Sequence, residues 1–422
     1  MCIEEKKALW KKINGLRLSY IYKYIYHTMQ QEQTDQQEQT QDNSTFEVNP
    51  FEVKGQVNYN RLIEMFGAQP ITPEIIERFE RVVGVKAHTF LRRGLFLSHR
   101  DLDLLLNHVE TKGKNNIYLY TGRGPSSVSM HLGHYIPFTF TKWLQDVLEA
   151  KLVIQMTNDE KFLFKDLTLE QVQEMTKENI KDIIAIGFDP KRTFIFDNIS
   201  YIQTLYPNIL KVQKHLNINK LQSAFGFTNS DHVGKYMFPA IQMVPAFYTS
   251  FPIFLKELKQ DALCIIPCAI DQDNYFRLLR DLCSVCNYRK PVLVHSKFLP
   301  SLGGSSNGKM SSSTGDALYL NASKKQIDKA VKSSVSGGGS TLELQRLYGA
   351  DLEKDTAFQY LKIFLDDDDE LNHIATEYQS GRMLTGQVKQ RCVQVLEPLF
   401  KEFQEKRASI TEEQYQEFIN KN

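Results

Sequence analysis

Residues 120–134 read YTGRGPSSVSMHLGH, and this stretch decides the fold because a short apolar run precedes it and a long helical pattern follows it. Gly122 and Gly124 flank Arg123 where the chain must turn sharply. Glycine permits both unusual backbone angles and the close approach of a ligand. The stretch therefore predicts a strand, a glycine loop and a helix start in direct succession.

His131 and His134 follow the loop, and a helix that begins near Met130 places both imidazoles on one face of its first turn. The start of a helix offers unpaired amide donors and the positive end of the helix dipole, which together favour an anion. The pattern thus predicts a polyphosphate site. Taken alone, the two histidines would be polar residues at an exposed helix start. A zinc site is disfavoured, because no third and fourth ligand accompanies them at suitable spacing.

A second stretch, residues 308–313, reads GKMSSS and lies in a loop rich in glycine and serine. In such a loop Lys309 can move, and a mobile lysine can close over a triphosphate and neutralise charge that develops as pyrophosphate departs. The alternative is a solvated surface lysine.

A pair of cysteines, Cys283 and Cys286, has metal or redox spacing, but its apolar helical surroundings favour buried thiols, so no metal site is expected.

Short apolar runs alternate with helical patterns from residue 117 to residue 295, which predicts an α/β fold with a Rossmann-like parallel sheet. Strands are expected at 117–120, 151–156, 193–196, 263–267 and 291–295. Helices are expected at 71–83, 98–109 with Ser98 as cap, 132–147, and from Thr168, which forms a capping box with Gln171. Beyond residue 320 the pattern is all-helical, at 321–333, 341–347, 356–378, 387–407 and 412–419.

The 422 residues are 42% hydrophobic and 24% charged, which is typical of a soluble globular protein of two domains. Residues 30–45 are a polar low-complexity run, so we expect an N-terminal extension and disordered linker over 1–45. A Rossmann-like catalytic domain with preceding N-terminal elements is expected over 46–320, and a helical domain over 321–422.

No apolar run could cross a bilayer, and the first residues do not form a targeting signal, so a cytoplasmic location without a membrane partner is expected. A net charge of +1 leaves any RNA contact to local basic patches.

The ordered pair of motifs resembles the class I aminoacyl-tRNA synthetases. HLGH at 131–134 is similar to the first signature of that family, HIGH, and KMSSS at 309–313 is similar to the second, KMSKS. Ser312 stands where a second lysine is frequent. The stretches LRRGLFLSHRD, IPFTFTKWLQDV, VIQMTNDEK, FGFTNSD and PCAIDQD narrow the resemblance to tryptophanyl-tRNA synthetases of the eukaryotic cytosolic type, over residues 45–420.

The resemblance implies a role for each residue that matches a family motif. For ATP, the implied residues are Arg123, His131, Gly133, His134, Lys309, Met310 and Ser311, with the two histidines and Lys309 also catalytic. For the amino acid, they are Tyr120 and Gln155 at the indole nitrogen and Glu160, Gln242 and Gln272 at the polar end. An indole N–H needs an acceptor and an ammonium group needs an oxygen, which is the chemistry that these side chains offer.

The resemblance further implies ligation of tryptophan to tRNA(Trp) through tryptophanyl-adenylate, with ATP as substrate and Mg²⁺ accompanying it. The implied partners are tRNA(Trp), read by the C-terminal helices, and a second copy of the chain, with no DNA. Two alternatives remain open. A tyrosyl-tRNA synthetase shares the architecture and a similar loop, and a non-catalytic interaction protein could keep the fold. The TGRGPSS and HLGH motifs favour tryptophan over tyrosine, and the intact His131, His134 and Lys309 argue for an enzyme.

Overall fold

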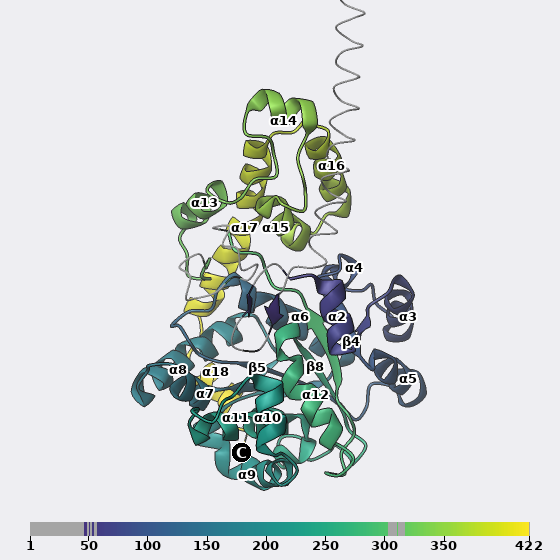
Figure 1. The fold of residues 1–422 in the computed structure, drawn as a ribbon, viewed down its shortest axis with the longest axis vertical. Coiled ribbons are helices and arrows are strands. Elements are labelled where there is room, and N and C mark those ends of the chain that lie inside the picture. The colour runs from purple at the N-terminus through teal and green to yellow at the C-terminus, as the bar shows by residue number, and fades with distance from the viewer. Residues whose placement is uncertain are drawn as a thin grey trace, which may run out of the picture.

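The computed structural model describes residues 46–48, 50, 53–54, 57–302, 310 and 317–421, and Figure 1 shows their arrangement. The expected extension and linker over 1–45 therefore lie outside the described residues, as do Lys309 and Ser311. A seven-stranded sheet forms the centre of the part that contains the first motif, and helices cover both of its faces.

The strands of this sheet follow the order β3-β4-β9-β8-β5-β6-β7. From β9 to β7 neighbouring strands run parallel, whereas β3 and β4 add an antiparallel edge. A separate two-stranded sheet is formed by β1 and β2. The strands are β1 (Glu47–Val48), β2 (Val53–Lys54), β3 (Gln69–Pro70), β4 (Phe96–Arg100), β5 (Ile117–Arg123), β6 (Lys151–Met156), β7 (Thr193–Asp197), β8 (Leu263–Ala269) and β9 (Val292–Ser296). The α/β fold with a mostly parallel sheet is therefore confirmed.

The chain reverses its direction of progress across the sheet beside β5. It moves from β5 through β6 to the edge strand β7, and then returns to the other side of β5 as β8. In doubly wound sheets a crevice opens at such a switch point, outside the carboxyl ends of the strands. The glycine loop follows the carboxyl end of β5, so the fold places the first motif at this crevice.

The helices fall into a group around the sheet and a C-terminal group (Figure 1). They are α2 (Tyr59–Phe66), α3 (Pro73–Val83), α4 (Thr89–Arg92), α5 (Leu102–Lys112), α6 (Leu132–Leu148), α7 (Asn158–Phe164), α8 (Leu169–Ala185), α9 (Asn198–Gln213), α10 (Ile218–Phe225), α11 (Val233–Met243), α12 (Asp273–Leu282), α13 (Lys324–Lys332), α14 (Leu342–Tyr348), α15 (Thr356–Phe364), α16 (Asp368–Gln379), α17 (Thr385–Ala408) and α18 (Glu412–Ile419).

Alternation along the strands divides the core into two layers. Ile117 and Leu119 of β5 face one layer, which contains the apolar sides of α5, α6 and α8. Tyr118 and Tyr120 face the other, which contains those of α9 to α12. Successive side chains of a strand point to opposite faces, so the register of β5 alone decides that Tyr120 lies among the helices of the second layer.

The C-terminal helices are not isolated from the sheet. The buried residues of α13, α15, α16 and α17 belong to the same apolar cluster as α6 and α8. The 24-residue α17 runs from the outlying helices back to the sheet region, where α18 packs against β7 and α8 (Figure 1).

Two expectations from the sequence are wrong in detail. Ser98 does not cap a helix but lies within β4, where its hydroxyl is 3.1 Å from Nδ1 of His295 on β9; α5 starts only at Leu102. The pairing of β4 with β9 overrides the local cap signal. The single helix over 356–378 is broken, because Asp367 caps a new helix by accepting the backbone N–H of Asp369 and Glu370.

A buried ion pair joins the antiparallel edge of the sheet to α12. Arg100 of β4 donates from Nε to Oδ1 of Asp273 at 2.6 Å and from Nη2 to Oδ2 at 2.7 Å. Asp273 is fully buried. Burial alone would raise the pKa of this carboxyl group, but hydrogen bonds from Arg100 and His295 outweigh it and hold the pKa well below its usual range. Since Gln272 directly precedes Asp273, the pair also fixes the start of α12 beside the crevice.

Asp273→Asn should lower the free energy of unfolding by about 3–5 kcal/mol, the scale for leaving one charge of a buried pair uncompensated. Because the folded-state pKa is depressed, this stabilisation should be complete above the unfolded-state pKa of about 4 and be lost as the pH falls below it. Urea unfolding at several pH values measures both effects. The exposed pair of Lys112 with Asp261 is the matched control, and Asp261→Asn should cost less than about 1 kcal/mol. Equal losses in the two variants would contradict the assignment.

Candidate functional site

Two polar side chains of α8 hydrogen bond to the backbone of the loop between β5 and α6. Asn179 donates from Nδ2 to the carbonyl oxygen of Ser127 at 2.7 Å, and Asp182 accepts the backbone N–H of Met130 at 2.8 Å. Both side chains are fully buried. A loop of irregular backbone in the interior needs such partners, because its amide and carbonyl groups cannot all bond to one another.

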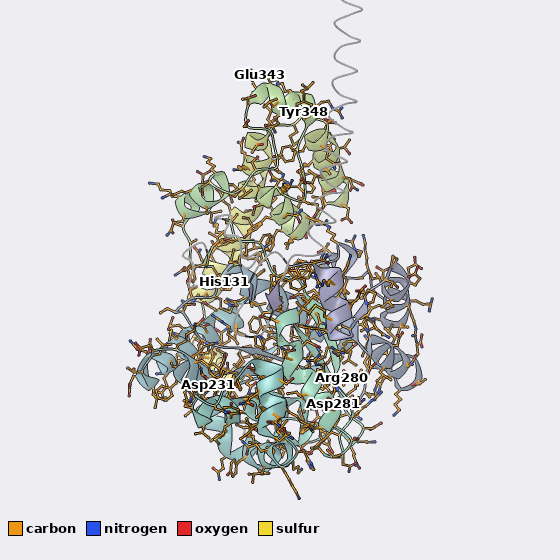
Figure 2. All side chains as sticks on the ribbon, viewed as in Figure 1. His131, Asp231, Arg280, Asp281, Glu343 and Tyr348 are labelled. Atoms are coloured by element: carbon orange, nitrogen blue, oxygen red, sulfur yellow. The ribbon has the colours of Figure 1, made fainter. Side chains whose placement is uncertain are left out.

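The two histidines stack at the start of α6. His131 is the residue before the first helical turn, and its ring stacks on that of His134 with 3.6 Å between the ring centroids and 27° between the ring planes. Gly133 lies between them, and a Cβ atom there would be 3.1 Å from the His131 ring and 3.8 Å from Cβ of Leu299. Figure 2 shows His131 at the junction between the sheet and the C-terminal helices. The pair therefore sits at a crowded helix start next to the glycine loop.

One residue of the second motif and one residue that follows it contact the region of the first motif. Met310 is buried, and its backbone N–H donates to the carbonyl oxygen of Leu299 at 3.0 Å, next to Gly133. Beyond the loop, Leu318 accepts the backbone N–H of Leu132 at 2.9 Å. Of the second motif, only Met310 belongs to the described residues. These contacts place Met310 of the second motif and Leu318, which follows it in the chain, close to the start of α6.

Arg123 ends β5 with a buried guanidinium group. Its Nε donates to Oδ1 of Asn179 at 3.1 Å, whereas its Nη2 has no hydrogen-bond partner among the described residues. Burial lowers the pKa of Arg123 to about 10, with the carboxylates of Glu160 and Asp182 acting in the opposite direction. The group therefore stays charged at neutral pH. A buried cation with an unused donor is suited to a phosphate oxygen.

A second group of site residues lies in the layer on the other side of β5. The Tyr120 hydroxyl is 2.6 Å from Oε1 of Gln155 and 2.7 Å from the carbonyl oxygen of Gln242. The hydroxyl has one proton and can donate to only one of these acceptors at a time. When it donates to Gln242, Oε1 of Gln155 remains available to the N–H of a ligand. Tyr120 and Gln155 are both buried.

The remaining predicted pocket residues lie around this pair. Gln242 donates from Nε2 to Oε1 of Gln272 at 2.9 Å. Glu160 accepts from the Thr157 hydroxyl at 2.7 Å and from Lys161 Nζ at 2.7 Å. The structure therefore joins Tyr120, Gln155, Gln242 and Gln272 in one chain of hydrogen bonds. Glu160 enters from the first turn of α7 and is not part of that chain.

Sequence reasoning missed Asn179 and Asp182, and it also missed Asp159 and Asn198, which hydrogen bond behind Gln155. A signal for the first two was present. They interrupt the apolar stripe of α8 at helical spacing from Met175, which is unusual for polar residues. Asp159 and Asn198 gave no such signal, because they lie in the first turns of α7 and α9, where polar residues are common.

No group of three or more His, Cys, Asp or Glu side chains that could hold a metal occurs in the part of the chain that the structure describes. Cys264, Cys268 and Cys283 are buried free thiols, and burial raises the pKa of each. Among the described helices, none is long and apolar enough to span a bilayer.

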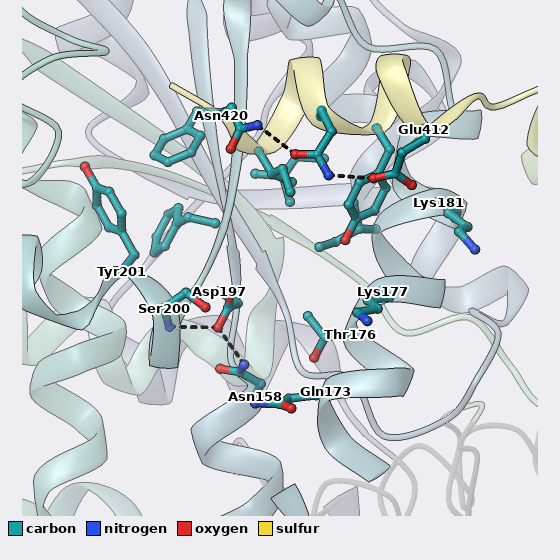
Figure 3. Close-up of a pocket in the computed structure, with 17 residues that line it drawn as sticks. Asn158, Gln173, Thr176, Lys177, Lys181, Asp197, Ser200, Tyr201, Glu412 and Asn420 are labelled. Carbon is teal, nitrogen blue, oxygen red and sulfur yellow. Dashed lines mark hydrogen bonds between the residues drawn. The ribbon is translucent and has the colours of Figure 1, made fainter. Parts of the chain in front are cut away.

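A cavity of about 570 Å³ lies between α8, β7 and α18, away from the predicted site residues (Figure 3). Asn158, Asp197 and Ser200 form part of its wall. Asn158 Nδ2 donates to Oδ1 of Asp197 at 2.7 Å, and that oxygen also accepts the backbone N–H of Ser200. None of the residues assigned to ATP or to the amino acid lines this cavity, so it is separate from the crevice at β5.

Comparison with known proteins agrees with this geometry. The family model described as tRNA synthetases class I (W and Y) matches residues 111–401. The cytoplasmic tryptophan–tRNA ligase of Dictyostelium discoideum is 48% identical over 382 residues, which span 88% of this chain and 95% of that protein. The Homo sapiens ligase of the same name is 48% identical over 367 residues, spanning 86% and 77%. The solved structure of Plasmodium falciparum tryptophanyl-tRNA synthetase has a TM-score of 0.81 and 43% identity, and covers 87% of this chain and 98% of that one.

The chain therefore belongs to the class I aminoacyl-tRNA synthetases of the W and Y type. Within that class it belongs to the tryptophanyl-tRNA synthetase family of the eukaryotic cytoplasmic type. The resemblance drawn from the motifs is confirmed. ATP is a substrate of this class of enzyme.

Gly124 is predicted to be essential for the position of Glu160. A Cβ atom at this position would lie 2.2 Å from Cε of Lys161 and 2.8 Å from Oε2 of Glu160. Gly124→Ala should lower kcat/KM for the amino acid in ATP–pyrophosphate exchange by roughly 10²-fold, the scale for a 1 Å misplacement. The melting temperature should change little, since the displaced atoms end flexible side chains. Gly386→Ala, where a Cβ atom meets nothing within 4 Å, is the control. Unchanged exchange in Gly124→Ala would refute the prediction.

Proposed function

We infer that this chain is a tryptophan–tRNA ligase. It activates L-tryptophan with ATP to form tryptophanyl-adenylate and pyrophosphate, and then transfers tryptophan to tRNA(Trp). The observation that carries the proposal is the buried pair of Tyr120 on β5 and Gln155 on β6. The chain that leaves β5 forms the glycine loop and then the HLGH start of α6, so this pair lies close to the proposed phosphate site. The neighbouring strands β5 and β6 thus place an acceptor for an indole N–H next to a site for phosphate. The names of the cytoplasmic relatives support the same activity and a cytoplasmic location.

For ATP we assign the start of α6, with His131, Gly133 and His134, together with Arg123. The support for Arg123 is its buried charge and the unused donor Nη2. Lys309, Met310 and Ser311 are assigned to the phosphates on the basis of the KMSSS sequence, and the anchoring of Met310 beside Gly133 agrees with this role. Mg²⁺ would accompany the triphosphate, held by phosphate oxygens and water, because Mg²⁺ favours such ligands over a protein cage.

For tryptophan we assign Tyr120 and Gln155 to the indole nitrogen. Glu160, Gln242 and Gln272 are assigned to the ammonium and carboxylate groups, which need oxygen acceptors and an amide donor respectively. The Tyr120 hydroxyl can donate to only one of its two acceptors, so an amino acid without a matching N–H would leave the other unpaired, and this penalty is the source of discrimination.

In the activation step, a carboxylate oxygen of tryptophan attacks the α-phosphorus of ATP. A bond forms between that oxygen and the phosphorus, and the bond to the bridging oxygen of pyrophosphate breaks and leaves its electron pair there. The carboxylate is already ionised at neutral pH, so no protein base is required. Arg123 and the helix start at His131 hold the phosphates, and the cationic Lys309 stabilises the departing pyrophosphate. Catalysis thus consists of positioning and charge stabilisation.

We propose that residues 321–422 form an anticodon-binding domain and residues 46–320 the catalytic domain. The C-terminal helices support this division because α14 lies at the end of the molecule far from the sheet, with His131 between the two (Figure 2). A tRNA presents its anticodon and its acceptor end at opposite ends of the molecule, so a reader of the anticodon must lie apart from the site of transfer.

We also propose that the chain forms a homodimer through helices α7, α9 and α11. These helices pack against one another, and their outer surfaces carry large exposed apolar side chains. These side chains are Phe162, Ile199, Tyr206, Leu210, Val233 and Met237. An apolar surface of this kind is typical of a contact between protein chains.

ATP–pyrophosphate exchange measured with each of the twenty amino acids tests the proposed activity. We expect exchange with tryptophan, and exchange with tyrosine reduced by several orders of magnitude, because the buried acceptors are matched to an indole N–H. Robust exchange with tyrosine would overturn the specificity. Absence of exchange with every amino acid would favour a protein that keeps the fold without the activity.

The double substitution Val233→Glu with Met237→Glu should convert a dimer into a monomer, since it places two charges on the apolar surface of α11. Analytical ultracentrifugation measures the change in mass. Val85→Glu alters an exposed valine outside this surface, after α3, and should leave the dimer intact. A monomeric wild-type chain at micromolar concentration, or a double variant that remains dimeric, would refute the proposed interface.

A further inference from the structure

A glutamine side chain can present either an oxygen or an N–H₂ group to a ligand, and only the oxygen accepts an indole N–H. The proposed function assigns Gln155 to this contact, but it leaves open what keeps its oxygen toward the pocket. We propose that Asn198 and Asp159 are positioning residues that fix the orientation of the Gln155 amide, and so set the preference for an amino acid whose side chain carries an N–H. The inference rests on the proposed function, and its test separates the two.

Three side chains form a directed chain of hydrogen bonds behind the pocket. Gln155 donates from Nε2 to Oδ1 of Asn198 at 2.7 Å. Asn198 donates from Nδ2 to Oδ1 of Asp159, also at 2.7 Å. The chain joins β6, the first residue of α9 and the first turn of α7. The side chains of Gln155 and Asn198 are fully buried, so no solvent can replace a bond that is lost.

The direction of this chain follows from its last member. An ionised carboxylate only accepts hydrogen bonds, so Asp159 must receive the N–H₂ end of Asn198. Asn198 then presents its oxygen to Gln155, which must donate its own N–H₂ group and leave Oε1 facing Tyr120. Burial raises the pKa of Asp159 to about 6 against the hydrogen bonds from Asn198 and Glu160, and since this value is still below 7 the group is mostly ionised at neutral pH.

A main-chain carbonyl group supports the same orientation. The oxygen of Ile241 accepts from Nε2 of Gln155 at 3.1 Å, and a carbonyl oxygen cannot donate. A reversed Gln155 amide would therefore place its oxygen against two acceptors, Oδ1 of Asn198 and the oxygen of Ile241. The Asn198 amide could donate to a reversed Gln155 only if it turned over as well, and its oxygen would then face the carboxylate of Asp159, which cannot donate.

A second pair of the same kind cross-links the same two helices next to Asp159 and Asn198. Asn158 and Asp197, the residues that immediately precede them, hydrogen bond at 2.7 Å on the wall of the cavity (Figure 3). Asp159 Oδ1 also accepts the backbone N–H of Glu160 at 2.8 Å. Two Asn–Asp pairs thus join the starts of α7 and α9, but only the pair of Asn198 with Asp159 contacts Gln155.

The test compares tryptophan with 3-(benzothien-3-yl)alanine, in which sulfur replaces the indole N–H at nearly the same shape. The ratio of their kcat/KM values in ATP–pyrophosphate exchange measures what the N–H contributes. We expect the wild-type chain to prefer tryptophan by at least 10²-fold, as for a site built around a donor of the substrate. Asn198→Ala and Asp159→Ala should each reduce this ratio at least roughly 10-fold, mainly through a higher KM for tryptophan, while kcat/KM for the sulfur analogue changes little.

Two further variants separate orientation from stability. Asp159→Asn should restore most of the preference, because the backbone N–H of Glu160 keeps an oxygen at the position that accepts from Asn198. Asn158→Ala removes the neighbouring cross-link of α7 and α9 without touching Gln155, so it should lower the melting temperature but keep the ratio. If Asn198→Ala does not fold, the comparison of Asp159→Ala with Asp159→Asn still tests the proposal, because Asp159 is only half-buried and its replacement is better tolerated.

The outcomes separate the positioning role of Asn198 and Asp159 from the assignment of Gln155 to the indole nitrogen. A folded Asp159→Ala or Asn198→Ala chain that keeps the wild-type ratio, or that loses tryptophan and the sulfur analogue equally, overturns the positioning role. A wild-type chain that uses both amino acids equally well, or activates neither, overturns instead the assignment of Gln155 to the indole nitrogen.

Discussion

The site depends on one constraint, which is that the irregular chain between β5 and α6 must find hydrogen-bond partners inside the protein. Helix α8 supplies them. Asn179 bonds to the Arg123 side chain and to the backbone of Ser127, and Asp182 accepts the backbone N–H of Met130. These contacts are spaced along the path from the end of the strand to the residue before the first histidine. Glycine gives the loop its freedom, and the buried polar residues of a neighbouring helix select one conformation from it.

The same helix connects the site to the C-terminal part of the chain. Arg407, at the end of α17, donates to Oδ1 of Asp182 and to Glu178, both at 2.5 Å. Burial raises the pKa of Asp182, while the Met130 amide and Arg407 act against that effect. One carboxylate thus receives a donor from the loop on one oxygen and a donor from the C-terminal helices on the other. The position of α17 and the position of the first motif are therefore not independent.

Local signals allowed much of the fold to be predicted from the sequence. The strand at 151–156, the helix at 412–419 and the capping box of Thr168 involve residues close in the chain, and the structure has them where they were expected. Ser98 was misassigned because its partner, His295, is 197 residues away. The motif residues were recognised from family resemblance, and their roles remain predictions. Their supporting partners were missed because the bond between Gln155 and Asn198 spans 43 residues and leaves no periodic trace.

The last helix has a consequence for how the protein behaves in solution. β7 is an edge strand of the sheet, and α18 packs against it. An uncovered edge presents a row of unsatisfied backbone groups that can pair with another chain and start aggregation. The eight residues Glu412–Ile419 lie against this edge strand, and we infer that they hinder the approach of another chain to it. A chain cut short before this helix would retain both sequence motifs and yet become prone to intermolecular strand pairing.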